Sequence, residues 1–167
     1  MNLGATTVSL GGAAAGTIIL AVVVQRWWIK EGHKVPALIP YILAGFYGVL
    51  VVLCAGGLLG SAGHIVLWGG NTIGDAGLVY GVGGHTHNAT SHRIVPLTDG
   101  GYVMVLLATA LLIGALKWSK KIPKAKVVLG STTGILLGLN AGVAGALAVP
   151  LANFANLSGA WWAGGVQ

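Results

Sequence analysis

Three histidines stand close together in the chain, in a pattern that could bind a transition metal. His85 and His87 form a His-x-His pair, and His92 follows a few residues later. Imidazole nitrogens bind zinc and copper. No cysteine lies near these histidines, and the segment around them is rich in Gly, Thr and Asn, as polar loops are. We therefore expect a polar loop without zinc or copper, and the alternative is a metal-binding or pH-responsive loop.

Little else in the chain could do chemistry. The sequence holds no serine-nucleophile motif, no paired carboxylates and no phosphate-binding loop, so we expect no enzyme. No charged residue stands inside an apolar segment, although proton relays and ion-coupled transporters usually need one. Asn140 is a lone amide within the last apolar segment. We expect it to hydrogen-bond a neighbouring helix, and the alternative is a contact with a substrate or ion.

The basic residues gather in two short clusters that flank apolar segments. They are Arg26, Lys30 and Lys34 in the first cluster and Lys117, Lys120, Lys121, Lys124 and Lys126 in the second. Lysine and arginine bias loops toward the cytoplasmic side of a membrane, and anionic lipid headgroups attract them. The clusters therefore predict two cytoplasmic loops that meet phospholipid headgroups, and they do not predict nucleic-acid binding.

The composition predicts that lipid is the solvent for much of this chain. Its 167 residues are 55% hydrophobic and 7% charged, whereas soluble proteins carry roughly 25% charged residues. A membrane-spanning helix needs about 20 apolar residues. Four segments reach or approach that length, and they cover about residues 4–24, 35–68, 101–116 and 127–162.

These segments predict an all-α integral membrane protein of one domain. Its four transmembrane helices form two helical hairpins, at about 4–70 and 101–165, joined by an outer loop at 71–100. Both basic loops are then cytoplasmic, and both termini lie outside. The second and fourth helices are too long for one span, so we expect both to be extended on the outer side. Gly56-Gly57 and Pro150 are the expected breaks.

Small residues recur every four positions and predict close helix packing. The positions are Gly12 and Gly16 in the first segment, Gly56 and Gly60 in the second, and Gly130, Gly134, Gly138 and Gly142 in the fourth. Such rows join helices either between subunits or within one bundle, and the sequence does not separate the two. The two halves of the chain also look alike, since each has a basic turn followed by a long segment that ends in Trp and Gly. A duplicated helical hairpin, whose two copies are related by an axis along the membrane normal, would account for this likeness.

Each half resembles a conjugative or type IV secretion pilin. The residues that carry the resemblance are the basic turns at 26–34 and 117–126 and the small-residue faces. Those pilins are small Ala/Gly-rich helical hairpins with both ends outside and a short basic cytoplasmic loop. The resemblance implies that the basic loops contact phospholipid headgroups and that the helices pack into a filament.

These observations predict a non-enzymatic, self-associating structural subunit. It would serve in a filament, in a secretion or conjugation assembly, or in a virus-associated membrane, either membrane-embedded or exported into an extracellular assembly. The alternatives are a small channel or pore, including a holin-like one, and a metal-binding or pH-sensing protein that uses the histidine loop. The expected partners are other copies of the chain and membrane lipids, with bound phospholipid in place of a cofactor and with no nucleic acid.

Overall fold

The computed structural model describes residues 8–87, 96–119, 122–140 and 146–166. All the elements in these ranges are helical, which confirms the prediction of an all-α protein. In chain order they are α1 (Leu10–Lys30), α2 (Val35–Val52), α3 (Gly57–Ala76), the π-helical turn η1 (Gly77–Gly81), α4 (Asp99–Trp118), α5 (Lys124–Gly138) and α7 (Ala148–Val166). Among the described helices α1, α2 and α4 are long and apolar enough to cross a membrane.

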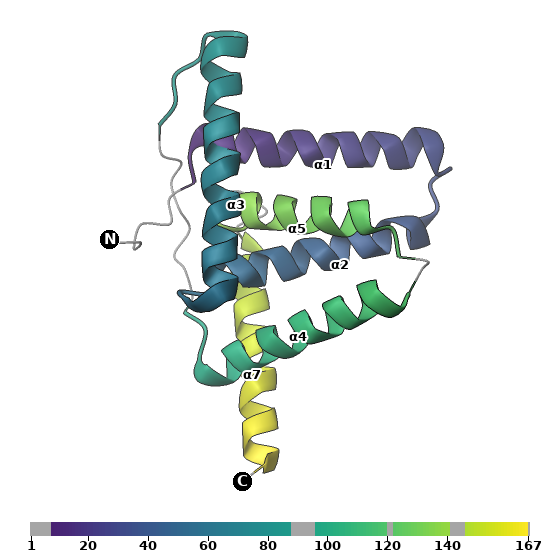
Figure 1. The fold of residues 1–167 in the computed structure, drawn as a ribbon, viewed down its shortest axis with the longest axis vertical. Helices are drawn as coiled ribbons and strands as arrows, with labels where there is room; N and C mark the ends of the chain where they lie inside the picture. Colours follow the sequence, from purple (N-terminus) through teal and green to yellow (C-terminus); the bar gives the residue numbers. More distant parts are fainter. Residues whose placement is uncertain (1–7, 88–95, 120–121, 141–145, 167) are drawn as a thin grey trace.

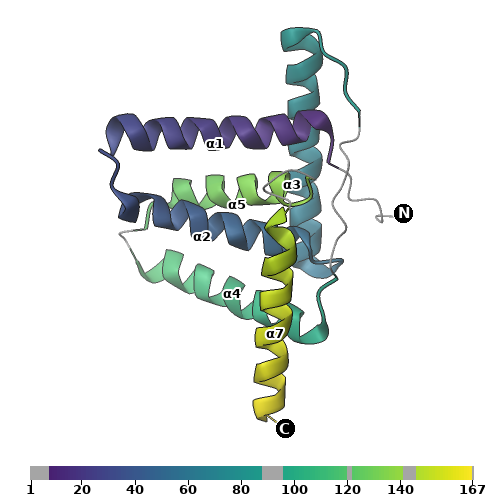
Figure 2. The same cartoon turned by 180° about the vertical axis from the view of Figure 1, so that it is seen from behind.

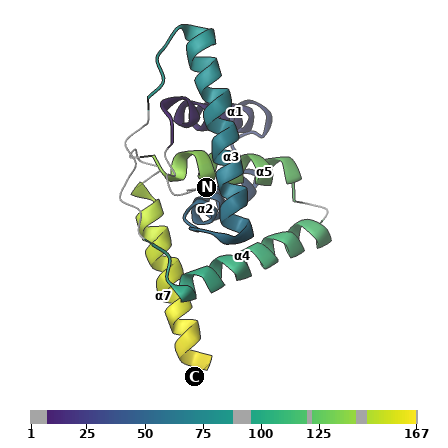
Figure 3. The ribbon, with the colours of Figure 1, turned by 60° about the vertical axis from the view of Figure 1, so that its left-hand side comes forward.

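Four helices lie side by side in a layer, and two others cross one end of it (Figure 1). The order across the layer is α1, α5, α2 and α4, and the view from behind in Figure 2 shows the same order. The helices α3 and α7 cross the layer at the same end, and the chain runs along them in opposite directions (Figures 1 and 3). We call this the crossing end, and the opposite end, where α1 and α4 finish and α2 and α5 begin, the basic end.

The packing within the layer differs from the predicted pair of hairpins. A short turn joins α1 to α2, but α5 lies between them and packs against both (Figures 1 and 2). The most extensive contact in the layer is the one between α2 and α5, which belong to different halves of the chain. The halves therefore interlock through α2 and α5 instead of standing as two separate hairpins.

Both long apolar segments are interrupted, and the described residues of each form two long helices. The first division lies between Val52 and Gly57, where Gly56 is extended and Gly57 has a φ of 73°. A positive φ favours glycine, so the predicted break at Gly56-Gly57 is confirmed. The second division lies between α5 and α7, and the prediction of a break at Pro150 was wrong. That proline stands in the first turn of α7, where its missing N–H leaves no helical hydrogen bond unmade.

Several helix limits also differ from those predicted. The helix α3 continues to Ala76 and η1 to Gly81, so residues 71–81 are helical and do not belong to an outer loop. The helix α1 extends to Lys30 and α4 to Trp118, so Lys30 of the first basic cluster and Lys117 of the second lie in a last helical turn. Cations in these two last turns offset the negative end of the helix dipole, which favours this extension.

The core lies where the crossing helices meet the layer. Its largest fully buried side chains are Val8, Val105, Leu136 and Leu139. Most of α4 is surrounded by few neighbours, and beyond the buried Val105 its side chains of Leu106, Leu111 and Ile113 are exposed. The crossing end is therefore the compact part of the molecule, and the layer helices extend from it toward the basic end (Figure 1).

Candidate functional site at the two ends of the layer

The two basic clusters meet at the basic end. Arg26 and Lys30 belong to the end of α1, Lys34 precedes α2, Lys117 ends α4, and Lys124 and Lys126 begin α5. All of these except Lys126 are exposed, and Lys120 and Lys121 lie outside the described residues. The tertiary structure therefore forms one cationic surface from clusters that are far apart in the chain.

An ion pair fastens the two clusters together. The Nζ of Lys126 lies 2.6 Å from the carboxylate of Glu31, and it also donates to the carbonyl oxygen of Ala37 at 2.7 Å. Both charged side chains are about three-quarters buried. Lys126 stands in the first turn of α5, where a cation opposes the helix dipole, and Glu31 offsets this cost. Lys126 is thus a structural residue, unlike its exposed neighbours in the basic clusters.

Aromatic side chains stand among the exposed cations. Trp28 packs edge-on against His33 with ring centroids 4.0 Å apart, and Trp27 contacts both rings. The indole N–H of Trp27 donates to the carbonyl oxygen of Lys34 at 2.9 Å, which holds the turn between α1 and α2. Trp118 is 83% exposed at the end of α4. Tryptophan beside lysine is typical of a side chain set at the interface between hydrocarbon and headgroups.

At the crossing end, glycines allow the backbones of two helix pairs to touch. A Cβ on Gly74 of α3 would overlap with the carbonyl group of Gly11 in α1. A Cβ on Gly100 of α4 would lie 2.8 Å from the carbonyl carbon of Gly159 in α7. Each crossing helix therefore packs on the first turn of the layer helix that begins its own half of the chain.

An asparagine of the crossing helix hydrogen-bonds the start of the layer helix at each of these crossings, and we call these two contacts the asparagine locks. The side-chain oxygen of Asn71 accepts the backbone N–H of Ser9, the N-cap of α1, at 3.2 Å. The side-chain oxygen of Asn156 accepts the backbone N–H of Thr98, the N-cap of α4, at 2.8 Å and its hydroxyl at 3.1 Å. The amide of Asn156 also donates to Pro96, at 3.2 Å. Both asparagines thus satisfy a donor at a helix start that would otherwise lack a partner.

The two locks are equivalent positions of an internal repeat. Ser9-Leu10-Gly11-Gly12 matches Thr98-Asp99-Gly100-Gly101, and Asn71-Thr72-Ile73-Gly74 matches Asn156-Leu157-Ser158-Gly159. In both halves the Ser or Thr caps the layer helix through the N–H of the second glycine. The likeness drawn from the Trp-Gly ends pairs Trp68 with Trp161, a different register from that of the asparagines, and it did not include these motifs. Self-alignment of the chain on Gly-Gly and Asn-x-x-Gly would have found them.

The predicted glycine rows pack inside the bundle. Gly130, Gly134 and Gly138 face α2, at Tyr41, Gly45 and Val49 respectively. In the first half, Gly12 meets Asn71, Gly16 meets Leu136 and Leu137, and Gly60 meets the carbonyl of Cys54. Gly56 has open space around it, and Gly142 lies outside the described residues. Asn140 is half-buried just beyond α5, and its backbone N–H donates to Leu137. Of the two readings of the rows, the structure supports packing within one chain.

Two ionisable side chains at the crossing end lie close to backbone. The Oδ1 of Asp75 is buried against Gly11 in the first turn of α1, where the helix dipole favours a negative charge. Cys54 is buried in the turn that follows α2, and this burial raises the pKa of its thiol. A raised pKa leaves less thiolate at neutral pH, so Cys54 is a poor nucleophile.

The histidines of the predicted loop are exposed where the structure describes them. His85 and His87 follow η1, and the carbonyl oxygen of His87 accepts the backbone N–H of Leu10. His92 lies outside the described residues. Within the described ranges, no three side chains of His, Cys, Asp or Glu stand close enough to hold a metal ion.

The outward faces of the crossing helices are apolar. On α3, Leu58, Ile65 and Trp68 are exposed on the side opposite Gly60, Gly63 and Leu67, which are buried. On α7, Phe154, Leu157 and Trp161 are exposed at helical spacing. Contiguous exposed apolar surface marks sites of contact with protein or membrane.

No family model matches this chain, and neither does any curated protein or any solved structure. The fold and its two ends define the class: a protein whose described elements are all helical, with three membrane-compatible helices among them, cationic at one end and crossed by two helices at the other. Its function must be argued from its own geometry.

Proposed function

We propose that this protein is a non-enzymatic structural subunit that spans a membrane and associates with copies of itself. The four layer helices are the spans in this proposal. The exposed apolar side chains along α1, α2 and α4 support it, because a surface of this kind suits lipid and is costly in water. The helix α5 has 15 residues, or roughly 22 Å, against a hydrocarbon core of about 30 Å. Its place between α1 and α2 shields it from lipid, so it needs no full apolar length.

The proposed orientation puts the basic end in the cytoplasm. Exposed cations from both halves and the exposed rings of Trp28 and Trp118 would meet anionic headgroups there. The crossing helices α3 and α7 would then lie at the outer surface. The resemblance of the basic turns to those of conjugative pilins supports the same contact with phospholipid.

A cysteine scan tests this orientation in whole cells. In a Cys54→Ser background, Tyr80→Cys in η1 should react with an impermeant maleimide, and Trp118→Cys at the end of α4 should not. Both positions are highly exposed in the structure, so a difference in labelling reports the side of the membrane. The opposite labelling pattern would overturn the orientation.

The observation that carries self-association is the apolar outward face of α3 and α7. Trp68 is 71% exposed and Leu157 is 72% exposed, on helices that cross the end of the layer. The described glycines of the rows, apart from Gly56, pack within the chain, so the proposed surface for a second copy is these apolar faces. Aromatic and aliphatic side chains of this kind carry most of the binding energy in subunit interfaces.

The mass of the particle in native lipid tests self-association. After extraction with a copolymer, the wild type should have a mass several times that of one 16.8 kDa chain plus its lipid. The double variant Trp68→Ala with Leu157→Ala should shift to smaller particles. Trp118→Ala, which removes an equally exposed ring at the basic end, is the matched control and should keep the wild-type mass. A wild type that is already a monomer, or a double variant with unchanged mass, would refute the proposal.

A further inference from the structure

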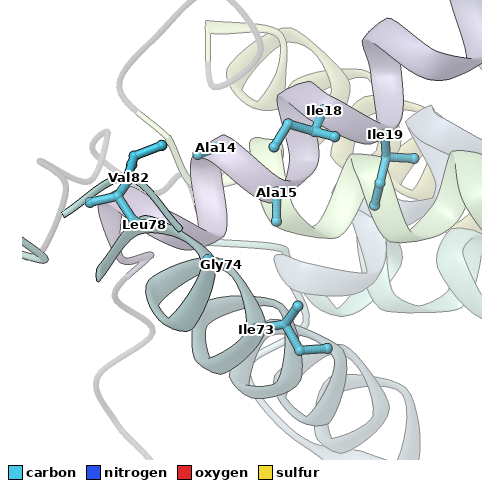
Figure 4. A pocket seen from close by; sticks show the side chains of 9 residues that line it. Ala14, Ala15, Ile18, Ile19, Ile73, Gly74, Leu78 and Val82 are labelled. Atoms are coloured by element: carbon cyan, nitrogen blue, oxygen red, sulfur yellow. The ribbon is translucent and has the colours of Figure 1, made fainter. Parts of the chain in front are cut away.

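An apolar groove lies between α1 and α3, close to the point where they cross. Its volume is about 560 Å³, and its walls are formed by Ala14, Ala15 and Ile18 on one side and by Ile73, Gly77 and Leu78 on the other. Figure 4 shows the side chains of Ile18, Ile19 and Ile73 standing along it with no polar group among those drawn. The volume is within the range of roughly 300–1,000 Å³ that ligand sites occupy. A groove with this lining can recognise only an apolar ligand.

Two small residues that line the groove have larger counterparts in the second half of the chain. Alignment of the two locks places Met104 of α4 at the position of Ala15 and Trp162 of α7 at the position of Gly77. Both residues of the second half are much larger than their counterparts. At these two positions the first half is smaller, whereas Ile19, Ile73 and Leu78 match the smaller Ala108, Ser158 and Ala163. Enlarging Ala15 or Gly77 would therefore fill part of the groove.

The groove continues onto the surface that faces lipid in the proposed orientation. Ile18 is 62% exposed and lies in the first half of α1, and Leu20, Val22 and Val24 continue the exposed apolar surface along the same helix. The groove is thus at the depth of the outer half of the bilayer, below the crossing helix. At this depth the abundant apolar molecules are the acyl chains of lipids.

We propose that this groove is a binding site for one acyl chain of a membrane lipid from the outer leaflet. An unfilled groove would leave the methyl groups of Ile18, Ile19 and Ile73 without contacts on one side, and a chain of methylenes supplies those contacts. The chain would lie against both α1 and α3 and thereby brace the crossing helix on the layer. The inference rests on the proposed membrane embedding of α1, and it does not depend on self-association.

Photo-crosslinking in vesicles tests this site. The protein is reconstituted with a phosphatidylcholine that carries a diazirine on its acyl chain, and labelled peptides are quantified by mass spectrometry. Leu111, an exposed residue in the middle of α4, reports contact with ordinary surrounding lipid. Labelling of the groove residues Ile18 and Ile73 should exceed labelling at Leu111, because a held chain stays longer than a passing one.

The variants for this test introduce the residues that stand at the matching positions of the second half. Gly77→Trp introduces the residue of the second half, and the open space around Gly77 accepts a side chain. It should lower labelling in the groove to the level at Leu111 without changing the latter. Gly69→Trp is the control, because Gly69 lies on the same helix, also has open space, and does not line the groove. Ala15→Met is the second variant, for use if thermal unfolding shows that Gly77→Trp disturbs the fold.

The outcomes of this experiment distinguish a failure of the proposed acyl-chain site from a failure of the proposed membrane embedding. Groove labelling that is no stronger than at Leu111 in the wild type overturns the acyl-chain site. Strong groove labelling that survives both Gly77→Trp and Ala15→Met overturns it as well. Absence of labelling at Leu111 and in the groove alike would refute the embedding of α1 and α4, and with it the proposed function.

Discussion

The change Gly134→Ala is expected to push the two central helices apart. Gly134 of α5 faces Gly45 of α2, and a Cβ at Gly134 would lie 2.9 Å from the carbonyl carbon of Gly45 and nearer still to its oxygen. Real Cβ atoms essentially never come within 3.0 Å of such atoms. The obstacle is helix backbone, which has no rotamer to change, so the helices themselves must separate.

The magnitude follows from two opposing effects. Overpacking of a well-packed site costs typically 1–3 kcal/mol, and a clash with backbone belongs near about 3 kcal/mol. Replacing glycine by alanine in a helix interior stabilises by roughly 1 kcal/mol. The net loss in the free energy of unfolding should therefore be about 2 kcal/mol.

Reversible unfolding by SDS in mixed micelles, followed by tryptophan fluorescence, measures this loss. The matched control is Gly114→Ala in α4, where the added Cβ would lie 3.5 Å from the ring of Trp118, an ordinary contact. That variant should be as stable as the wild type or more stable, by up to about 1 kcal/mol. Equal stability of the two variants would show that α5 does not pack on α2 through this face, and the interlocked layer would be wrong.

Three further predictions concern the ends of the layer. Asn156→Ala should lower the free energy of unfolding by about 2 kcal/mol, because three partly exposed hydrogen bonds are lost, whereas Asn153→Ala on the exposed side of α7 should change it by less than about 0.5 kcal/mol in the same SDS titration. A double-mutant cycle of Lys126→Met and Glu31→Gln should give a coupling of roughly 1 kcal/mol, and additive effects would show that the ion pair does not join the two clusters. Cys54 should react with maleimide at neutral pH only after unfolding, since burial shields its thiol and raises its pKa. A fast reaction in the native protein would contradict this prediction and would show that the turn after α2 opens.

The glycine rows show how far sequence reasoning reaches in this protein. The spacing at Gly130, Gly134 and Gly138 correctly predicted a face of close helix contact. It did not identify the partner, because any helix with an exposed backbone groove accepts such a face. The structure brings α2 to it, where Gly134 lies against the carbonyl group of Gly45, and a Cβ at Gly45 itself would make only an ordinary contact with the carbonyl oxygen of Gly130 at 3.6 Å. A periodic pattern shows that one face of a helix carries small side chains, whereas the choice of partner helix depends on the shape of both surfaces.

The asparagine locks show a different limit. Asn71 follows the second apolar segment and Asn156 lies inside the fourth, and the sequence gives neither residue a partner. In the structure the amide of Asn156 is occupied by Thr98 and Pro96, so it serves the fold. A single polar residue forms no periodic pattern. Only the recurrence of Asn three residues before a glycine, at Gly74 and again at Gly159, distinguishes these asparagines from other polar residues.

The amino-acid sequence by itself determined the helical class, the membrane-compatible helices α1, α2 and α4, the break at Gly56-Gly57 and the two basic clusters. These features follow from local causes: apolar content, backbone freedom at glycine, and charge. Only the tertiary structure decided that α5 separates α1 from α2, that Glu31 pairs with Lys126, and that α3 and α7 cross the same end of the layer. These features join residues far apart in the chain, and they depend on which surfaces fit together after each helix has formed.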